Sequence, residues 1–204
     1  MRLLDQALEA KINVLTFNAF AGPKYPFVGR HDDLGDGYDL AKYLVEKMAG
    51  QGNVAILSGS PTAPEHVGRV EGFKKALAEY SNVKIVFEEP DNDDLGQAVS
   101  LAENALQAHP DLNGFLCCNA SNPIGAARAV KNAGKAGKIL IAGMDNLPET
   151  LEFVKEGVIL VTKVQRQWDI GYWTLRYLVA MNKGQTIPRD HDTGASMVTA
   201  ETLK

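Results

Sequence analysis

Several residue types are scarce in this chain, and each scarcity argues against a class of protein. The two cysteines among its 204 residues, Cys117 and Cys118, are adjacent on a predicted strand. Their side chains therefore point to opposite faces of that strand, and we expect two buried thiols in place of a disulfide. The four histidines lack the close spacing of metal ligands, so we assign no metal and no cofactor.

Long apolar runs and an excess of positive charge are also missing. No apolar stretch approaches the roughly 20 residues that cross a bilayer, and the amphipathic first ten residues carry acids, unlike a signal peptide. The formal net charge is -4, and acidic and basic residues are interspersed along the chain. We therefore expect no membrane span, no export signal within the chain and no nucleic-acid partner.

The chain does contain an alternation of short apolar runs with longer segments of helical period. This alternation is typical of βαβ units, so we predict an α/β fold with a doubly wound parallel sheet that is covered on both faces. The predicted strands are 13–17, 54–58, 84–88, 114–118, 138–143 and 158–163. The predicted helices are 3–9, 32–48, 65–80, 95–108, 123–133, 148–156 and 167–183.

Two regions interrupt this alternation. Residues 18–30 are rich in glycine and proline, and we predict a crossing segment without regular structure there. Residues 184–196 are polar and lead to a last short strand near Met197. The first predicted helix and strand have no preceding strand to pair with, so we expect the chain to begin inside a domain.

Three predicted strands each lead into one polar side chain. These side chains are Asn119, Asp145 and Gln165, which lie 26 and then 20 residues apart, about one βα unit each. Ligands of doubly wound folds bind beyond the carboxyl ends of the strands, so three consecutive loops could present these groups to one crevice. Each residue also has a purely structural interpretation as a turn, a helix cap or a solvated loop residue.

Other loops offer weaker candidates. Residues 59–66 follow a strand and open a helix, but they lack the lysine and the glycine spacing of a phosphate loop. The acidic run 88–94 is expected to form a solvated face with a helix cap in it, and Asn92 is the member best placed to face a crevice.

Of the two tryptophans we expect Trp173 in the core, and Trp168 is the candidate to stack on a sugar ring. No nucleophile and base follow neighbouring strands, so catalytic residues are not assigned.

Short motifs through almost the whole chain carry a resemblance to a known family. In order they are 54–61 (VAILSGSP), 69–73 (RVEGF), 108–112 (AHPDL), Asn119 with 125–127 (GAA), 133–135 (AGK), 143–145 (GMD), 154–157 (VKEG) and Gln165 with Gly171. With these motifs the chain resembles the type I periplasmic (extracytoplasmic) solute-binding proteins of sugar ABC transporters, close to the ribose-binding group. The resemblance implies two doubly wound lobes, joined by three crossing strands, with a sugar held between them.

The resemblance also implies ligand-binding residues. Asn119, Asp145 and Gln165 match the family's ligand-binding Asn, Asp and Gln. The remaining matches depart from the family's pattern, and they argue against ribose itself and for another polyhydroxylated or aminated ligand. They are Asn18 and His31, each at a position where Asp is usual, Asn92 in place of an aromatic residue, and His66, next to Val67 at the position of a missing Arg.

The matched segments imply a complete second lobe and an incomplete first lobe. The expected parts are 1–20 as a remnant of the N-terminal lobe, 21–145 as the C-terminal lobe with the first crossing, 146–185 as the segment that returns to the N-terminal lobe, and 186–204 as the final crossing and last strand. An incomplete lobe leaves apolar surface exposed, so we expect self-association through it.

By this resemblance the chain is part of a binding protein and not an enzyme. The expected ligand is a monosaccharide or a related small polyol, and the expected partner is the membrane permease of an ABC transporter. The full-length protein is then periplasmic or extracytoplasmic. The alternative is the ligand-sensing core of a lactose-repressor-type transcription factor, which has the same fold.

Overall fold

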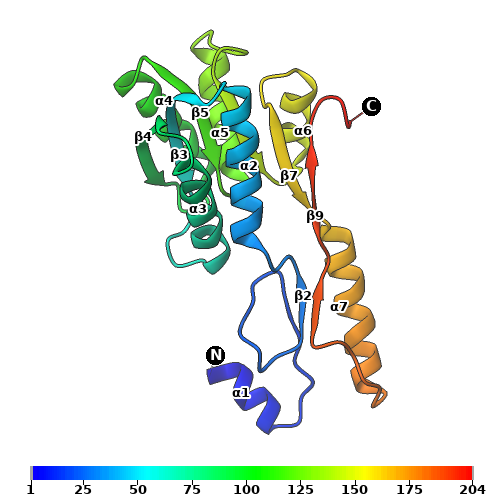
Figure 1. Ribbon diagram of the computed structural model, residues 1–204. Helices are drawn as coiled ribbons and strands as arrows, with labels where there is room; N and C mark the ends of the chain where they lie inside the picture. The colour runs from blue at the N-terminus through cyan, green and yellow to red at the C-terminus, as the bar shows by residue number, and fades with distance from the viewer. Residues whose placement is uncertain (1, 204) are drawn as a thin grey trace. The chain divides into compact units, whose positions relative to one another are not determined.

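The computed structural model describes residues 2–203, which form two compact units (Figure 1). Unit 1 comprises the residues up to His31 together with Gln165–Ala195. Unit 2 comprises Asp32–Val164 and the residues from Ser196 onward. No helix within the described residues is long and apolar enough to cross a bilayer.

A six-stranded sheet forms the centre of unit 2. Its strands, in the order in which they lie side by side, are β4 (Asn82–Pro90), β3 (Gln51–Ser58), β5 (Leu112–Cys117), β6 (Leu140–Met144), β7 (Val161–Gln165) and β9 (Ala195–Val198). The pairs from β4 through β7 are all parallel. Along the chain the strands are added first on one side of β3, with β4, and then on its other side, from β5 onward. This reversal confirms the predicted doubly wound sheet.

Helices cover both faces of this sheet. They are α2 (Asp33–Lys47), α3 (Pro64–Leu77), α4 (Leu95–Ala108), α5 (Ser121–Asn132) and α6 (Pro148–Lys155). Phe73 of α3 belongs to the core beneath α2 and α3, whereas Phe115 belongs to the core beneath α4, α5 and α6. Because side chains alternate along a strand, Cys117 lies in the second core and Cys118 in the first. Both are free buried thiols, as predicted.

Unit 1 is a smaller arrangement of short elements. Its sheet has the order β1 (Thr16–Phe17), β2 (Phe27–Gly29) and β8 (Asp190–Asp192), and both pairs are parallel. Its helices are α1 (Arg2–Glu9) and α7 (Gln167–Asn182) (Figure 1). Gly184 follows α7 with a φ of 70°, a conformation that ends helices and that glycine adopts readily.

Two strands of unit 1 correct the expectation from the sequence. The segment 18–30, predicted to lack regular structure, contains β2, whose residues Phe27 and Val28 are almost completely buried. The segment 184–196 contains β8 as well as the start of the expected strand at Met197. Both strands have only three residues and lie beside prolines, so neither produces a readable apolar run.

The unit boundaries also differ from the expected ones. Residues 21–31 lie in unit 1, because β2 pairs with β1 and β8. Residues 146–164, expected in the returning segment, lie in unit 2, because β7 pairs with β6 and α6 packs on the same sheet. Met1 and Lys204, at the ends of the expected segments, lie outside the described residues.

Candidate functional site

Strand register aligns four loop positions at the carboxyl edge of the sheet in unit 2. The pairs that set the register are Ser58–Pro90, Leu57–Cys117 and Leu116–Ala142. Counting onward from these pairs brings Asp91, Gly59, Asn119 and Asp145 to the same height. Neighbouring strands are about 4.8 Å apart, so these residues form one polar row across the edge.

Asn119 is at the centre of this row and bonds through both ends of its amide. Its Oδ1 accepts hydrogen bonds from the backbone N of Asn122 at 2.9 Å and of Ser121 at 3.1 Å, so it caps α5. Its Nδ2 donates to Oδ1 of Asp91 at 2.8 Å and to Oδ1 of Asp93 at 2.7 Å. A side-chain amide has two donor hydrogens and two acceptor lone pairs, so Asn119 reaches a ligand only by exchanging one of these partners.

Asp91 is a buried carboxylate that sequence reasoning missed. It has no exposed surface, and its Oδ1 accepts from Asn119 Nδ2 and from the backbone N of Asp93 at 2.9 Å. Its Oδ2 accepts from the hydroxyl of Ser121. The acidic run was expected to be solvated with one helix cap in it; Asp94 does cap α4, but Asp91 corrects that expectation. The available signal was its position directly after the last residue of a strand.

His66 packs beside Asn119 over the glycine that follows β3. The backbone N of Ser60 donates to His66 Nδ1 at 3.0 Å, so the proton of the neutral ring lies on Nε2, 3.8 Å from Asp93 Oδ1. A Cβ on Gly59 would lie 2.4 Å from His66 Nδ1 and 2.9 Å from Asn119 Nδ2. The absence of a side chain at Gly59 is therefore what allows both groups to share the edge.

The remaining candidates of unit 2 occupy exposed or edge positions. Asn92 is exposed and has a φ of 52°, between the two aspartates that bind Asn119. Asp145 is half-buried with a φ of 68°, and its backbone N donates to the Lys163 carbonyl at 2.8 Å. Its carbonyl oxygen accepts from the Thr162 hydroxyl at 2.6 Å, so the backbone of this residue is held on both sides.

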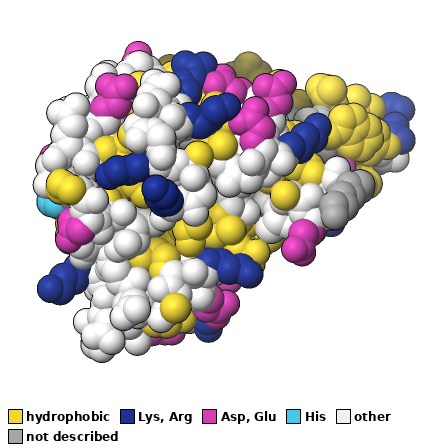
Figure 2. All heavy atoms as spheres, turned by 90° about the horizontal axis from the view of Figure 1, so that it is seen from above, with side chains coloured by type: hydrophobic (Ala, Val, Ile, Leu, Met, Phe, Trp, Pro, Cys, Tyr) yellow, Lys and Arg dark blue, Asp and Glu magenta, His cyan; other side chains and the backbone are white. Residues whose placement is uncertain are grey.

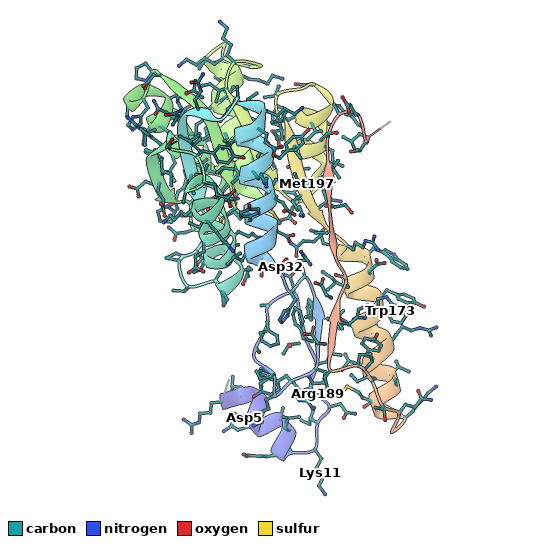
Figure 3. The ribbon with its side chains drawn as sticks, viewed as in Figure 1. Asp5, Lys11, Asp32, Trp173, Arg189 and Met197 are labelled. Atoms are coloured by element: carbon teal, nitrogen blue, oxygen red, sulfur yellow. The ribbon has the colours of Figure 1, made fainter. Side chains whose placement is uncertain are left out.

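Gln165 and the two tryptophans lie around the start of α7, in unit 1. Gln165 is the last residue of β7 and is 7% exposed. Trp168 is 74% exposed, and its ring stacks on Tyr172 with the centroids 5.0 Å apart. Trp173 projects from α7 with its ring 5.4 Å from that of His191 (Figure 3). It is 37% exposed, so the expectation that it belongs to the core was wrong; the short sheet of unit 1 is too small to cover it.

Asn18 and His31 follow the neighbouring strands β1 and β2 of unit 1. Asn18 is exposed and has a φ of 60°. The His31 ring meets the rings of Phe20 and Phe27 edge to face, with centroid distances of 4.8 and 5.7 Å. Its Nδ1 is 3.8 Å from Asp190 Oδ2. These contacts hold the His31 imidazole between aromatic rings near the end of the sheet.

A charged pair that sequence reasoning missed lies at the same edge of unit 1. Gly29 of β2 is paired with Asp192 of β8, and the next residue, Arg30, donates from Nη1 to Asp192 Oδ2 at 2.7 Å. An arginine directly after a strand is a candidate ligand-binding residue, but Arg30 was not recognised as one because β2 was not predicted.

The chemistry of the polar row in unit 2 is that of hydrogen bonding. Burial raises the pKa of the Cys118 thiol to about 12, and its Sγ accepts from the Gly59 backbone N at 2.9 Å, so this thiol is not a thiolate nucleophile. No group of three His, Cys, Asp or Glu side chains within residues 2–203 could hold a metal ion. The row, together with His66 and Asp93 beside it, therefore offers carboxylate oxygens, a side-chain amide and an imidazole N–H.

A small cavity adjoins the row. It has a volume of about 260 Å³ and is lined by Ser58, Gly59, Ser60, Pro61, His66, Val67, Val70, Glu71, Lys74 and Glu88. Typical sites for drug-sized ligands have about 300–1,000 Å³, so this space suits a smaller molecule. Acidic and basic side chains are interspersed on the face of the molecule that Figure 2 presents, with no large area of one sign.

Comparison with known proteins identifies similar chains. Residues 2–186 match the family model described as periplasmic binding protein domain. The chain is 32% identical over 185 residues to the D-allose-binding periplasmic protein of Escherichia coli (strain K12), which covers 90% of this chain and 59% of that protein. It is 28% identical over 201 residues to the ribose import binding protein of Salmonella typhimurium, which covers 96% of this chain and 66% of that protein. The chain thus spans about two thirds or less of the length of these relatives.

Solved structures with the same fold carry sugars. A periplasmic solute-binding protein of an ABC transporter from Actinobacillus succinogenes with bound D-allose superposes with a TM-score of 0.91 at 33% identity, covering 97% of this chain and 73% of that one. A solute-binding protein from Burkholderia graminis in complex with D-arabinose superposes with a TM-score of 0.93 at 32% identity, covering 99% and 72%.

Proposed function

Because this chain belongs to the periplasmic binding protein domain family, we propose that it is part of the solute-binding component of a sugar ABC transporter. The proposed ligand is a monosaccharide or a related small polyol, and the proposed partner is the membrane permease of that transporter. The full-length protein then works in the periplasm or outside the cytoplasmic membrane. The similar proteins bind D-allose, ribose and D-arabinose, and this supports a sugar ligand and the transporter over a transcription factor.

The polar row at the carboxyl edge of unit 2 carries this proposal. Asp145 accepts hydrogen bonds from ligand hydroxyls, and the Nε2–H of His66 donates one. Asp93, whose side chain is 52% exposed, exchanges its bond from Asn119 for a ligand hydroxyl, which frees one amide hydrogen of Asn119 for the ligand. Asn92 borders the same edge. Neutral hydroxyl groups suit this mixture of donors and acceptors, because each can donate and accept.

Unit 2 corresponds, in this proposal, to the second lobe of the family, and unit 1 to part of the first. The ligand-binding groups proposed for unit 1 are Gln165, the last residue of β7, and Asn18 and His31, which follow β1 and β2. The contact of Trp168 with ligand stays a prediction. The proposed activity is binding and release without catalysis. The row consists of hydrogen-bonding groups, and burial raises the pKa of the neighbouring Cys118 thiol, which keeps its proton.

A titration followed by nuclear magnetic resonance tests the proposal. D-allose, D-ribose and D-arabinose are added separately to the ¹⁵N-labelled chain, up to tens of millimolar. We expect amide shifts at 59–66, 91–94, 119–122 and Asp145, and we expect Asp145→Ala to weaken binding by roughly tenfold to a hundredfold, the cost of a lost buried hydrogen bond.

The matched control is Asp111→Ala, which removes a carboxylate from the residue just before β5, at the opposite end of that strand. This variant should bind as the parent does. Failure of all three sugars to shift these amides would overturn the proposal, and equal losses in the two variants would overturn the assignment of the row.

A further inference from the structure

Helix α7 carries an apolar stripe on the side that faces away from its own sheet. Ile170 and Thr174 are buried and form the inner side of the helix. The stripe on the outer side consists of Trp168 (74% exposed), Tyr172 (36%), Leu175 (67%) and Val179 (51%). Four large apolar side chains on one helix face are more than a solvated helix needs, and such a surface marks an interaction site.

The spacing of the stripe indicates what covers it. Its members follow one another at intervals of four, three and four residues. This is the heptad pattern, in which apolar residues recur every 3.5 residues on average, and it is the pattern by which one helix packs lengthwise against another. The stripe therefore has the spacing that packing against a second helix requires.

The stripe is complementary to itself when two copies of α7 run antiparallel. In the register that centres the two stripes, Trp168 of one copy meets Val179 of the other, and Tyr172 meets Leu175. Each large aromatic ring thus lies against a smaller aliphatic side chain, and the layers fill evenly. A parallel pairing would instead place Trp168 against Trp168 and Val179 against Val179, with unequal layers.

Charges beside the stripe favour the same direction. Asp169 and Arg176 flank it on one side, one heptad apart. In an antiparallel pair these flanks face each other, so Asp169 of each copy lies beside Arg176 of the other, which makes two ion pairs. On the opposite flank a Cβ added at Gly171 would meet nothing within 4 Å, so the two helices can approach closely there.

We propose that α7 is the interface through which two copies of this chain form an antiparallel dimer. The surface involved, named here the α7 stripe, consists of Trp168, Tyr172, Leu175 and Val179, with Asp169 and Arg176 at its rim. The interface gives the self-association expected from the sequence a defined location. Trp168 is also a predicted ligand contact, whereas Leu175, Asp169 and Arg176 are not, so substitutions at these three residues test the interface independently of the sugar proposed above.

Sedimentation velocity of the purified chain at increasing concentration tests the dimer. We expect a monomer–dimer equilibrium in the micromolar range, and we expect Leu175→Glu to raise the dissociation constant at least tenfold, because it places a carboxylate in the stripe. The matched control is Leu147→Glu, the same substitution at a side chain of unit 2 that is 44% exposed. It should leave the dimer intact, and circular dichroism verifies that both variants fold.

Charge reversal and cross-linking test the direction. Arg176→Glu should weaken the dimer, and adding Asp169→Lys to it should restore the dimer, since the two ion pairs re-form with exchanged signs. In an antiparallel dimer, a mixture of Trp168→Cys and Val179→Cys variants forms a disulfide between copies, whereas neither variant does so alone. The native thiols are buried and do not compete.

Three outcomes would overturn the proposal. In the first, the chain stays a monomer at every concentration. In the second, Leu175→Glu and Leu147→Glu weaken the dimer equally. In the third, two copies of the same cysteine variant form a disulfide with each other. The first would leave the stripe to another protein, the second would place the interface elsewhere, and the third would show parallel helices.

Discussion

The two units of this molecule differ in how completely their sheets are covered. In unit 2 helices pack on both faces, and both Phe73 and Phe115 have no exposed surface. In unit 1 three strands of two or three residues carry one long helix and one short one. Within residues 2–203, nine of the thirteen exposed large apolar side chains belong to unit 1, although it is the smaller unit.

The difference shows what a parallel sheet requires. Parallel strands are stable when both of their faces are buried, and sheets of very short strands gain little from pairing alone. Unit 2 meets this requirement with its own helices. Unit 1 meets it only in part, so we expect unit 2 to dominate the stability of the chain and unit 1 to supply an exposed apolar surface for interaction.

The largest expected effect contrasts the two units directly. Phe73→Ala should lower the free energy of unfolding by about 3–5 kcal/mol, because it leaves a cavity in a closed core of unit 2. Phe17→Ala in unit 1, at a side chain that is 58% exposed, should change it by less than about 1 kcal/mol. Urea unfolding followed by far-ultraviolet circular dichroism, and by the fluorescence of Trp168 and Trp173 for unit 1, measures both. Equal losses would contradict the contrast.

Ion pairs should show the same contrast on a smaller scale. In unit 2, Nζ of Lys163 lies 2.6 Å from Asp39 and 3.3 Å from Asp36, which has no exposed surface. Lys163→Ala should therefore cost about 3 kcal/mol, since it removes one ion-pair partner of a buried carboxylate. Arg30→Ala in unit 1 removes a pair whose Asp192 is 39% exposed and should cost about 1 kcal/mol or less. Urea midpoints of the two variants compare them.

Alkaline pH should weaken unit 2 through its thiols. Burial raises the pKa of Cys118 to about 12 and that of Cys117 well above its usual value. Below the pKa of an unfolded cysteine, about 8.5, the thiols keep their protons in both the folded and the unfolded state, and their contribution to stability is fully present. Above that pH the unfolded chain ionises first, so the free energy of unfolding falls by about 1.4 kcal/mol per pH unit through Cys118, up to about pH 12. Cys117, whose pKa is also raised by burial, adds to the loss in the same direction.

Unfolding in urea at pH 8 and pH 10, with Cys118→Ala as the comparison, measures this slope. The variant should lose less stability over the same interval, because one of the two thiols is gone. Rapid reaction of the native protein with a thiol reagent at pH 9 would contradict the assignment, since the thiols should react only after unfolding.

The smallest effect is expected on the surface of unit 2. Lys74 and Glu88 form an ion pair at 2.8 Å, but their side chains are 47% and 36% exposed. Lys74→Ala should cost about 0.5 kcal/mol or less, and salt should reduce the difference further. Thermal unfolding at low and high ionic strength checks this. A larger loss would mean that surface charges, and not the closed cores, set the stability of unit 2.

Predictability from the sequence follows the same division between the units. The strands and helices of unit 2 were predicted because each buried strand is an apolar run and each helix has its own period and a glycine, proline or aspartate near one of its ends. The strands β2 and β8 were missed, because three residues beside a proline leave no period to read. The position of Asp91 was hidden in a run of acids, most of which are solvated.

The sequence by itself determined the α/β class, the order of elements in unit 2 and the polar residues Asn119, Asp145 and Gln165 at the ends of three strands. Only the tertiary structure decided that Asp91, Asn119 and His66 share one hydrogen-bonded edge, and that the outer side of α7 is left uncovered. The reason is physical: apolar period and capping are local properties of a chain, whereas register and coverage depend on which strands pair and on which faces other elements bury.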